Sequence, residues 1–190
     1  DKIEQVEKII IPATATKVFG LPTIPLYDLP NLKYIVVEEG NPVFDSRENC
    51  NAVIETATNT LMMGCANTLI PSTVEAIYDD AFTNCYELKE LNLPENIKII
   101  HPTAFYNCFG LKEITIPKTM QIVDQMAFAG CENLEMVKFE GEDTMLGKDV
   151  FCYCHKLSKI LVPKAAVDKY REQLSEDFQN AVTSDIYIAE

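Results

Sequence analysis

The stretch "AFTNCYELKELNLP" at residues 81–94 decides the fold, because close copies of it return three times along the chain. It recurs as "AFYNCFGLKEITIP" at 104–117, as "AFAGCENLEMVKFE" at 127–140 and as "VFCYCHKLSKILVP" at 150–163, so each copy starts 23 residues after the one before. A constant period of this length is typical of repeat architectures, in which each repeat is one supersecondary unit. The sequence therefore predicts its fold in more detail than its function.

The same positions are apolar in every copy. An L-x-x-L-x-L spacing ends in strict alternation, which predicts a short strand with one buried face. In three copies a proline, at 94, 117 or 163, then ends the strand. A unit with a single strand cannot bury its own apolar side, so we expect an α/β leucine-rich-repeat solenoid: a right-handed superhelix with a parallel sheet, short helical turns and a continuous core.

Two rows of identical residues are expected to form the centre of that core. The phenylalanine row is Phe82, Phe105, Phe128 and Phe151, and the cysteine row is Cys85, Cys108, Cys131 and Cys154. A residue held at one phase of a solenoid packs inward, where a free thiol behaves as a small hydrophobe. A ladder of disulfides would have to pair the coils two by two and break their equivalence, so reduced, buried thiols are the favoured interpretation.

The whole chain, 1–190, is expected to be a single domain. Residues 1–40 hold looser copies of the repeat, 41–67 are an insertion, and 68–163 are the regular repeats. Residues 164–190 leave the pattern and are expected to form a cap of helix and strand that covers the last core layer.

The insertion contains two β-prone runs, "CNAVIET" and "NTLMMGC", joined near Ala57-Thr58. This arrangement predicts a β-hairpin on the flank of the solenoid. If the turn is centred there, Cys50 and Cys65 fall opposite each other. We therefore hypothesise a disulfide between these two residues.

The segment "AAVDKYREQLSEDFQNAV" at 165–182 predicts one amphipathic helix. Its apolar residues recur every three to four positions: Val167, Tyr170, Leu174, Phe178 and Val182. This helix and the final "IYI" are expected to supply the C-terminal cap.

The composition is that of a soluble, acidic globular chain, with 47% hydrophobic residues and a formal net charge of −13. Such a charge opposes binding to nucleic acid phosphates, so no nucleic acid partner is expected. No run of 18 apolar residues occurs, so this region is not expected to insert into a membrane. We presume that a signal peptide has been removed, and we expect a monomer.

No pattern of catalytic or metal-binding residues is visible. The chain has two histidines and no G-x-S-x-G, H-E-x-x-H or Walker pattern, and His101 is expected to lie in a solvated turn. The string "CYCH" at 152–155 lacks a second ligand pair, and Cys152 lies outside the phase of the cysteine row. The acidic "EGED" at 140–143 lacks the spacing of a calcium loop. No enzyme activity, metal or cofactor is therefore expected.

The outward positions of the repeat vary between copies and are the better place for a binding site. The strand face has an apolar N-terminal end, and on the turn side two aromatic residues share one phase with a third nearby. The candidate ligand-contact residues are Tyr34, Val36, Leu69, Tyr86, Tyr106 and Phe109. Adjacent exposed aromatics can form a recognition patch. The alternative is that those on the turn side only shield the turns.

The string A-F-x-N-C-x-x-L-x-x-I-x-I-P at this spacing resembles the BspA-like class of leucine-rich repeat, and the resemblance extends over essentially the whole chain. The flank at 41–71 also looks like the longer repeat variant found in such proteins of host-associated bacteria. The resemblance implies a secreted or cell-surface protein used for binding and adhesion. It carries no catalytic residues.

We therefore expect a non-enzymatic extracellular or cell-surface adhesion module that recognises a protein or a glycan. One alternative is a structural spacer that displays another domain. A second is an accessory polysaccharide-binding domain of an enzyme system. Full-length gene context would separate the spacer from the binding module, since a spacer should adjoin a second folded domain.

Overall fold

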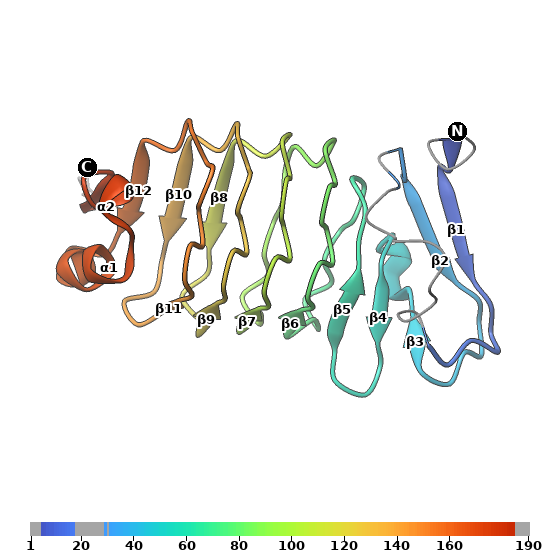
Figure 1. Ribbon diagram of the computed structural model, residues 1–190. Coiled ribbons are helices and arrows are strands. Elements are labelled where there is room, and N and C mark those ends of the chain that lie inside the picture. The colour runs from blue at the N-terminus through green and yellow to red at the C-terminus, as the bar shows by residue number, and fades with distance from the viewer. Residues whose placement is uncertain (1–4, 18–28, 30, 185–190) are drawn as a thin grey trace, which may run out of the picture.

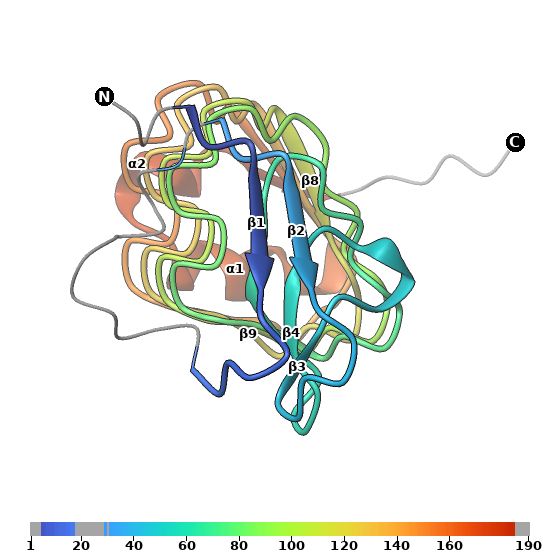
Figure 2. The same ribbon diagram turned by 90° about the vertical axis from the view of Figure 1, so that its right-hand side faces the viewer.

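The computed structural model describes residues 5–17, 29 and 31–184, which form a row of stacked coils (Figure 1). Viewed along the axis of the stack, the coils superimpose closely, with β1 (Lys8–Ile11) and β2 (Tyr34–Val37) nearest the viewer (Figure 2). The predicted solenoid of leucine-rich-repeat type, with its flanking hairpin and its C-terminal helical cap, is confirmed.

One side of the solenoid carries the strands that the repeat predicts. They form a parallel sheet of four strands, in spatial order β8 (Glu113–Ile116), β10 (Met136–Phe139), β12 (Lys159–Val162) and β13 (Val182–Ser184). Ile114 lies beside Val137, and Val137 beside Ile160, so the register equals the sequence period. Strands β1 and β2 form a separate parallel pair at the N-terminal end of the solenoid (Figure 1).

The copy at 81–94 is an exception, because its predicted strand is not formed. Residues 89–93 have no strand conformation, although they carry the same spacing of leucines as the other copies. The coil before them comes from the hairpin insertion, and its residues 64–70 form no strand either. Since a short strand is held by its hydrogen-bonded neighbours, the ladder is interrupted at this point.

A second sheet on another side of the solenoid was not predicted. Each regular coil contributes to it a strand of two residues: β6 (Ala76–Ile77), β7 (Ile99–Ile100), β9 (Ile122–Val123) and β11 (Met145–Leu146). All are parallel and in the register of the repeat. Two residues are too few to show alternation, so the sequence pattern indicated only an inward residue there.

The Ala-Phe-x-x-Cys segments form hydrogen-bonded turns on the remaining side. The Cys108 N–H donates to the Phe105 carbonyl at 3.3 Å within the turn, and the Phe105 N–H donates to the Ala127 carbonyl of the next coil at 2.8 Å. Asn107 has φ of 59°, in the left-handed region that asparagine tolerates better than most residues. The turns therefore join neighbouring coils as the strands do.

The predicted hairpin consists of β4 (Val53–Glu55) and β5 (Thr60–Met63), which pair antiparallel across residues 56–59. The short β3 (Phe44–Asp45) pairs with β4. The 3-10 segment Arg47–Asn49 follows β3 in the chain, and its backbone is kinked at Glu48, where φ is 59°. The hairpin extends the second sheet, because β5 pairs parallel with β6 to give the spatial order β11-β9-β7-β6-β5-β4-β3.

The C-terminal cap is more broken than the predicted single helix. A 3-10 turn (Lys164–Ala166) leads into α1 (Val167–Gln173), and α2 (Glu176–Gln179) follows after Leu174 takes extended backbone angles. Val182 lies in β13, not in a helix, and adds a strand to the edge of β12. The final "IYI" lies outside the described residues. None of the helices in the described ranges has the length and apolar character needed to cross a membrane.

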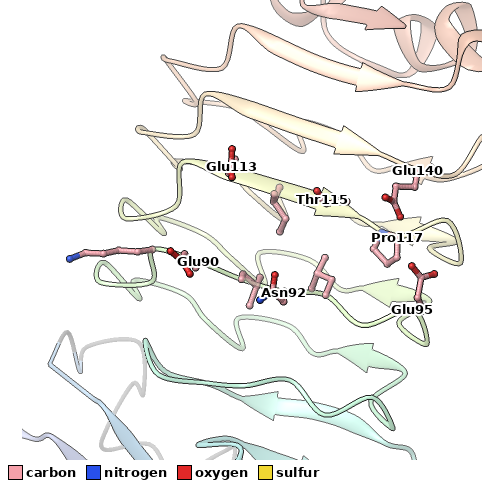
Figure 3. A pocket seen from close by; sticks show the side chains of 11 residues that line it. Glu90, Asn92, Glu95, Glu113, Thr115, Pro117 and Glu140 are labelled. Atoms are coloured by element: carbon pink, nitrogen blue, oxygen red, sulfur yellow. The ribbon is translucent and has the colours of Figure 1, made fainter. Parts of the chain in front are cut away.

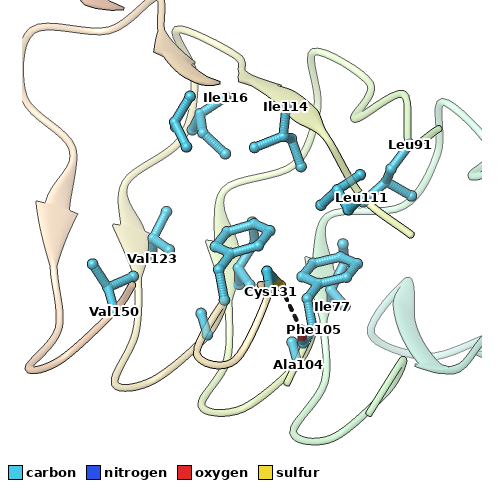
Figure 4. Packing of buried hydrophobic residues seen from close by; sticks show 14 of the residues in the cluster. Ile77, Leu91, Ala104, Phe105, Leu111, Ile114, Ile116, Val123, Cys131 and Val150 are labelled. Carbon is cyan, nitrogen blue, oxygen red and sulfur yellow. Dashed lines mark hydrogen bonds between the residues drawn. The ribbon is translucent and has the colours of Figure 1, made fainter. Parts of the chain in front are cut away.

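The core is a stack of equivalent side chains along the solenoid axis (Figure 4). All four phenylalanines of the predicted row are buried. The Phe82 and Phe105 rings stack with centroids 5.0 Å apart, as do those of Phe105 and Phe128, and the Phe128–Phe151 distance is 5.9 Å. The coils of Phe105 and Phe128 therefore pack on both of their neighbours through the same ring contact.

Candidate binding surface

The outward positions of β1, β2 and the coil at 64–70 expose four large apolar side chains, which we term the apolar patch. Their exposed fractions are 51% for Ile10, 48% for Tyr34, 38% for Val36 and 72% for Leu69. Ile10 lies directly beside Val36 in the parallel pair of β1 and β2. Ile10 was not among the candidate residues, although it lies in the same outward row as Val36 and could have been found from that row.

Strand alternation explains why the apolar patch faces outward. In β2 the burial alternates residue by residue, with Ile35 and Val37 buried and the residues between them exposed. The outward positions that most soluble sheets fill with polar residues are here apolar. An ion pair between Lys33 Nζ and Glu7 Oε1, at 2.8 Å, lies next to the patch in sequence and contributes polar groups to its rim.

On the turn side, the Tyr86 and Phe109 rings stack with centroids 4.9 Å apart and planes 8° apart. Tyr86 is 37% exposed and Phe109 is half-buried. Tyr106 is also half-buried and makes no ring contact with either of them within the described ranges. Only two of the three aromatic candidates on this side therefore come together.

The cysteine row belongs to the core. The thiols of Cys108, Cys131 and Cys154 are buried and point to the backbone carbonyls of Phe82, Phe105 and Phe128, at Sγ to O distances of 3.3, 3.2 and 3.1 Å. Figure 4 shows the bond from Cys131. Each thiol thus links its own coil to the coil before it.

Burial governs the acidity of these thiols. It raises the pKa of Cys108 well above its ordinary value, and the hydrogen bond with Cys154, together with burial, does the same for Cys131. Cys85 differs from the prediction because its side chain is half-buried, although the desolvation that it does experience raises its pKa to about 12. Cys85 lies in the coil that follows the hairpin insertion. The coil before it has no Ala-Phe-x-x-Cys turn.

The hypothesised disulfide between Cys50 and Cys65 is not formed in the structure, where both residues are free and buried. The two side chains belong to different hydrophobic clusters. A bulge at Val53/Ile54 shifts the hairpin register by one residue. The Cys65 Sγ consequently lies 3.5 Å from the carbonyl oxygen of Asn51 instead of facing Cys50.

The strand side also contains a hollow of about 430 Å³ where the ladder is interrupted, which we term the acidic groove (Figure 3). It lies between residues 89–95 and 113–117. Its apolar lining is Leu91, Leu93, Ile114 and Pro117. The charged residues that line it are Lys89, Glu90, Glu95, Glu113 and Glu140. No sequence signal pointed to it, because the copy that borders it has the ordinary repeat pattern.

The described ranges contain no group of three or more histidine, cysteine or acidic side chains arranged to hold a metal ion. His101 lies in its turn with Nδ1 3.5 Å from an oxygen of Asp79, and its ring is 5.8 Å from that of Tyr78. At the "CYCH" string, the Cys154 thiol points into the core and His155 is exposed. Among the described residues, the surface features considered further for a binding site are the apolar patch, the Tyr86–Phe109 stack and the acidic groove.

Several bacterial proteins of known structure have a similar fold, leucine-rich repeat proteins among them. One from Eubacterium ventriosum is 22% identical with a TM-score of 0.70, and the match covers 84% of this chain and 43% of that one. A leucine rich cell surface protein of Faecalibacterium prausnitzii is 22% identical with a TM-score of 0.70, and the match covers 96% of this chain and 49% of that one. The pneumococcal vaccine antigen PcpA is 16% identical with a TM-score of 0.57, and the match covers 95% of this chain and 56% of that one. These identities show the fold alone, and the chain spans less than two thirds of each of these proteins.

No curated protein was found to match the chain. The family model for the BspA type leucine rich repeat region matches residues 62–177 in six copies, which is more than half of the chain. A repeat fold of this bacterial surface-protein type implies a protein-interaction or adhesion module. The chain belongs to the BspA-type leucine-rich repeat family.

Proposed function

We propose that the chain is a non-enzymatic module that binds another protein outside the cell or at the cell surface, and that the apolar patch is its contact surface. The observation that carries this proposal is the exposure of Ile10, Tyr34 and Val36 at outward positions of the paired strands β1 and β2, together with the exposure of Leu69. Large apolar side chains gathered on one face of a soluble protein are typical of protein-interaction sites. Binding energy commonly concentrates in such anchors within a polar rim.

The location outside the cell rests on the family and on a neighbour of the same fold, which is described as a cell surface protein. The acidic net charge of −13 is compatible with a solvent-exposed extracellular module. Host proteins are therefore suitable first probes for a partner.

A glycan ligand is the second candidate, and the Tyr86–Phe109 stack is the feature that favours it. Sugars bind proteins by lying on exposed aromatic faces, but here the two rings cover one face of each other. Only the outer ring faces remain, one of which belongs to the half-buried Phe109. The apolar patch offers a broader surface and favours a protein partner.

A spacer that only displays another domain is the remaining alternative. A spacer needs a polar surface for solubility, and it gains nothing from large apolar residues on an outward row. The spacer hypothesis therefore does not explain the apolar patch.

The test is a binding screen of the chain against extracellular matrix proteins and glycans, followed by two double variants. Tyr34→Ala with Val36→Ser removes the centre of the apolar patch, and Tyr86→Ala with Phe109→Ala removes the aromatic stack. We expect the first pair to abolish binding to a protein found in the screen and the second to leave it unchanged. Circular dichroism and melting should stay close to those of the parent for the first pair.

If only the Tyr86/Phe109 double variant loses binding, the glycan ligand is favoured. The same holds if the screen finds binding to a glycan and to no protein. If neither pair alters binding to a partner identified in the screen, the apolar patch is not the contact surface. The hairpin insertion at 41–67 would then be the next region to test.

A further inference from the structure

The N-terminal end of the solenoid presents an open strand edge. β1 is the outermost element at this end, with β2 along one side of it (Figure 1 and Figure 2). Within the described ranges no strand lies along its other edge. At the opposite end, β13 and α1 cover the last regular coil, and the inward Ile160 and Val162 are fully buried. Among the described residues, only the C-terminal end of the stack therefore has a cap.

The unpaired backbone groups of β1 follow from its ladder with β2. The Tyr34 N–H donates to the Glu7 carbonyl at 3.0 Å, so the backbone of Glu7 faces β2. Successive residues of a strand direct their backbone groups to opposite edges. The N–H and C=O groups of Lys8 and Ile10 therefore face away from β2, where they present two donors and two acceptors in the spacing of a strand.

The hydrophobic core is also open at this end. The inward residues of β2, Ile35 and Val37, are buried, whereas those of β1, Ile9 and Ile11, are only half-buried. All four belong to one hydrophobic cluster or pack against it. The difference arises because β2 lies between β1 and the hairpin insertion, while β1 has a neighbour on one side (Figure 1). An open core layer and an unpaired edge, which is a ready template for another strand, thus occur together in β1.

We propose that two copies of the chain pair through β1, antiparallel and about a two-fold axis at Ile9. Lys8 of each copy then lies opposite Ile10 of the other and exchanges both of its backbone hydrogen bonds with it. Ile9 lies opposite Ile9 of the second copy on the inward face, so the two open core layers cover each other. The same surface is used by both copies, and the assembly closes at two.

Pairing through β1 does not rest on the protein partner proposed above. The side chains of Tyr34, Val36 and Leu69 keep their outward direction in the pair, and a protein partner can still reach them. The monomer expected from the sequence differs from this arrangement, because the repeat pattern does not indicate that β1 ends the stack without a cap.

The register follows from the side chains of β1. An axis at Lys8 would place the two Lys8 side chains directly opposite each other, and like charges in that position are destabilising. An axis at Ile10 would place Lys8 opposite Pro12, which has no N–H to donate. With the axis at Ile9, both outward residues find a donor and an acceptor, and the aliphatic stem of Lys8 lies beside the exposed Ile10 of the second copy.

Charge and shape favour a second copy over other occupants. The net charge of −13 makes two copies repel unless they meet where acidic side chains are few. In the described N-terminal segment, Lys8 and Lys17 outnumber the single acidic residue, Glu7. The Glu7 carboxylate is already paired with Lys33 Nζ. An isolated extended segment of another protein could pair with the backbone of β1, but only a second coil also covers the open core layer.

The acidic groove offers no comparable edge. Residues 89–95 of the same chain lie beside β8 and line the groove together with it. The Thr119 hydroxyl, from the coil of β8, donates to the carbonyls of Glu95 and Ile97 and holds the two coils together. The interruption of the ladder there is therefore closed by the chain itself, whereas the edge of β1 is not.

Sedimentation velocity of the whole chain over a roughly hundredfold range of concentration tests the association. We expect an equilibrium between monomer and dimer, with hydrogen-exchange protection of the Lys8 and Ile10 amides that grows with concentration. Ile10→Pro removes one outward N–H from each copy and leaves the ladder with β2 intact, as proline on an edge strand does. It should weaken the dimer roughly tenfold or more, because two hydrogen bonds are lost. Ile10→Ala, which keeps the N–H, is the matched control and should weaken it less.

A cysteine placed on the proposed axis tests the register. In a non-hydrogen-bonded antiparallel pair the Cα atoms lie about 4.5 Å apart, which is within the range of a disulfide. Ile9→Cys should therefore cross-link two copies under mild oxidation, and mass spectrometry of the linked peptide identifies the bond. Ile11→Cys is the control, since Ile11 is also half-buried but lies opposite Glu7 of the second copy. It should not cross-link to itself.

A chain that stays monomeric throughout the concentration range would overturn the proposal. So would a dimer that Ile10→Pro leaves equally strong while its circular dichroism matches the parent, because the interface would then lie elsewhere. Equal cross-linking by Ile9→Cys and Ile11→Cys would show contact without the proposed register. If Ile10→Pro disturbs the fold, the cross-link of Ile9→Cys decides alone. Protection of the Lys8 and Ile10 amides by a protein from the binding screen, in a monomeric chain, would assign the edge to that protein instead.

Discussion

The rings of Phe105 and Phe128 lie 5.0 Å apart and within 5° of parallel, although they belong to different coils of the solenoid. Phe105 → Ala removes a fully buried ring from the middle of the row and should lower the free energy of unfolding by about 3–5 kcal/mol. Coils touch only their neighbours, so the loss of amide protection should centre on the coils of Phe82 and Phe128. Chemical denaturation and hydrogen exchange measure the two effects.

Phe109→Ala is the matched control, because Phe109 belongs to the same coil but is half-buried. Its cost should be clearly smaller. A Phe105 variant that unfolds at the parent's denaturant concentration, or loses protection evenly along the chain, would contradict the packing described above.

The thiols should differ in reactivity in the native protein. Cys108 is fully buried, and burial raises its pKa well above the ordinary value, so little thiolate forms and reagents cannot reach it. Cys152 is half-buried and should be alkylated faster. Mass spectrometry of peptides after timed alkylation gives both rates. Equal rates for the two residues would show that Cys108 is not shielded by the core.

The buried thiols should also make the fold less stable in alkali. In the folded chain the pKa of Cys108 is raised, so above the pKa of the unfolded chain only the unfolded state loses this proton. The contribution of this thiol to the free energy of unfolding is then fully present below the pKa of the thiol in the unfolded chain, and it falls as pH rises above that pKa. With an unfolded thiol pKa near 8.5, the loss from one such residue is about 2 kcal/mol at pH 10.

Urea denaturation of the parent and of Cys108→Ala at pH 7 and pH 10 tests this expectation. The variant should be less stable at pH 7, because it leaves a cavity, but should lose less stability between the two pH values. A variant with the same alkaline loss as the parent would show that the Cys108 thiol does not contribute to it.

One buried hydroxyl links the C-terminal cap to the coil before it. The Tyr170 side chain is fully buried, and its hydroxyl donates to the Gly141 carbonyl at 2.8 Å. Tyr170→Phe keeps the ring contact with Phe139 and removes only this bond, so it should cost about 1–2 kcal/mol. Tyr170→Ala should cost more and should expose the last coil to proteolysis. Similar stabilities for the two variants would mean that the ring adds nothing to the cap.

The sequence predicted the features that depend on a repeated local pattern. The phenylalanine row, the inward faces of β8, β10 and β12, and the hairpin turn near Ala57-Thr58 all follow from period or turn chemistry. The second sheet was missed because two-residue strands carry no alternation. The helix break at Leu174 was missed because the apolar spacing continues through it, while the backbone turns to place Val182 beside Ile160.

Of the binding surfaces, too, the sequence predicted only the part that follows from a local pattern. Tyr34 and Val36 could be predicted as exposed, because alternation alone assigns them to the outward face. The acidic groove could not, because residues 89–93 have the leucine spacing of a strand and lose their pairing only through the neighbouring insertion. The register of Cys50 and Cys65 was wrong for a similar reason: a bulge shifts it, and no residue type signals that bulge.

The bond from each thiol to the coil before it has a consequence for how such a gene can change. The coils that carry Cys108, Cys131 and Cys154 each meet the coil before them through equivalent atoms. An unequal crossover between two in-phase copies would therefore delete or add one whole coil and leave matching surfaces at the junction. Such a change would alter the length of the array and leave the hairpin insertion and the C-terminal helices as they are.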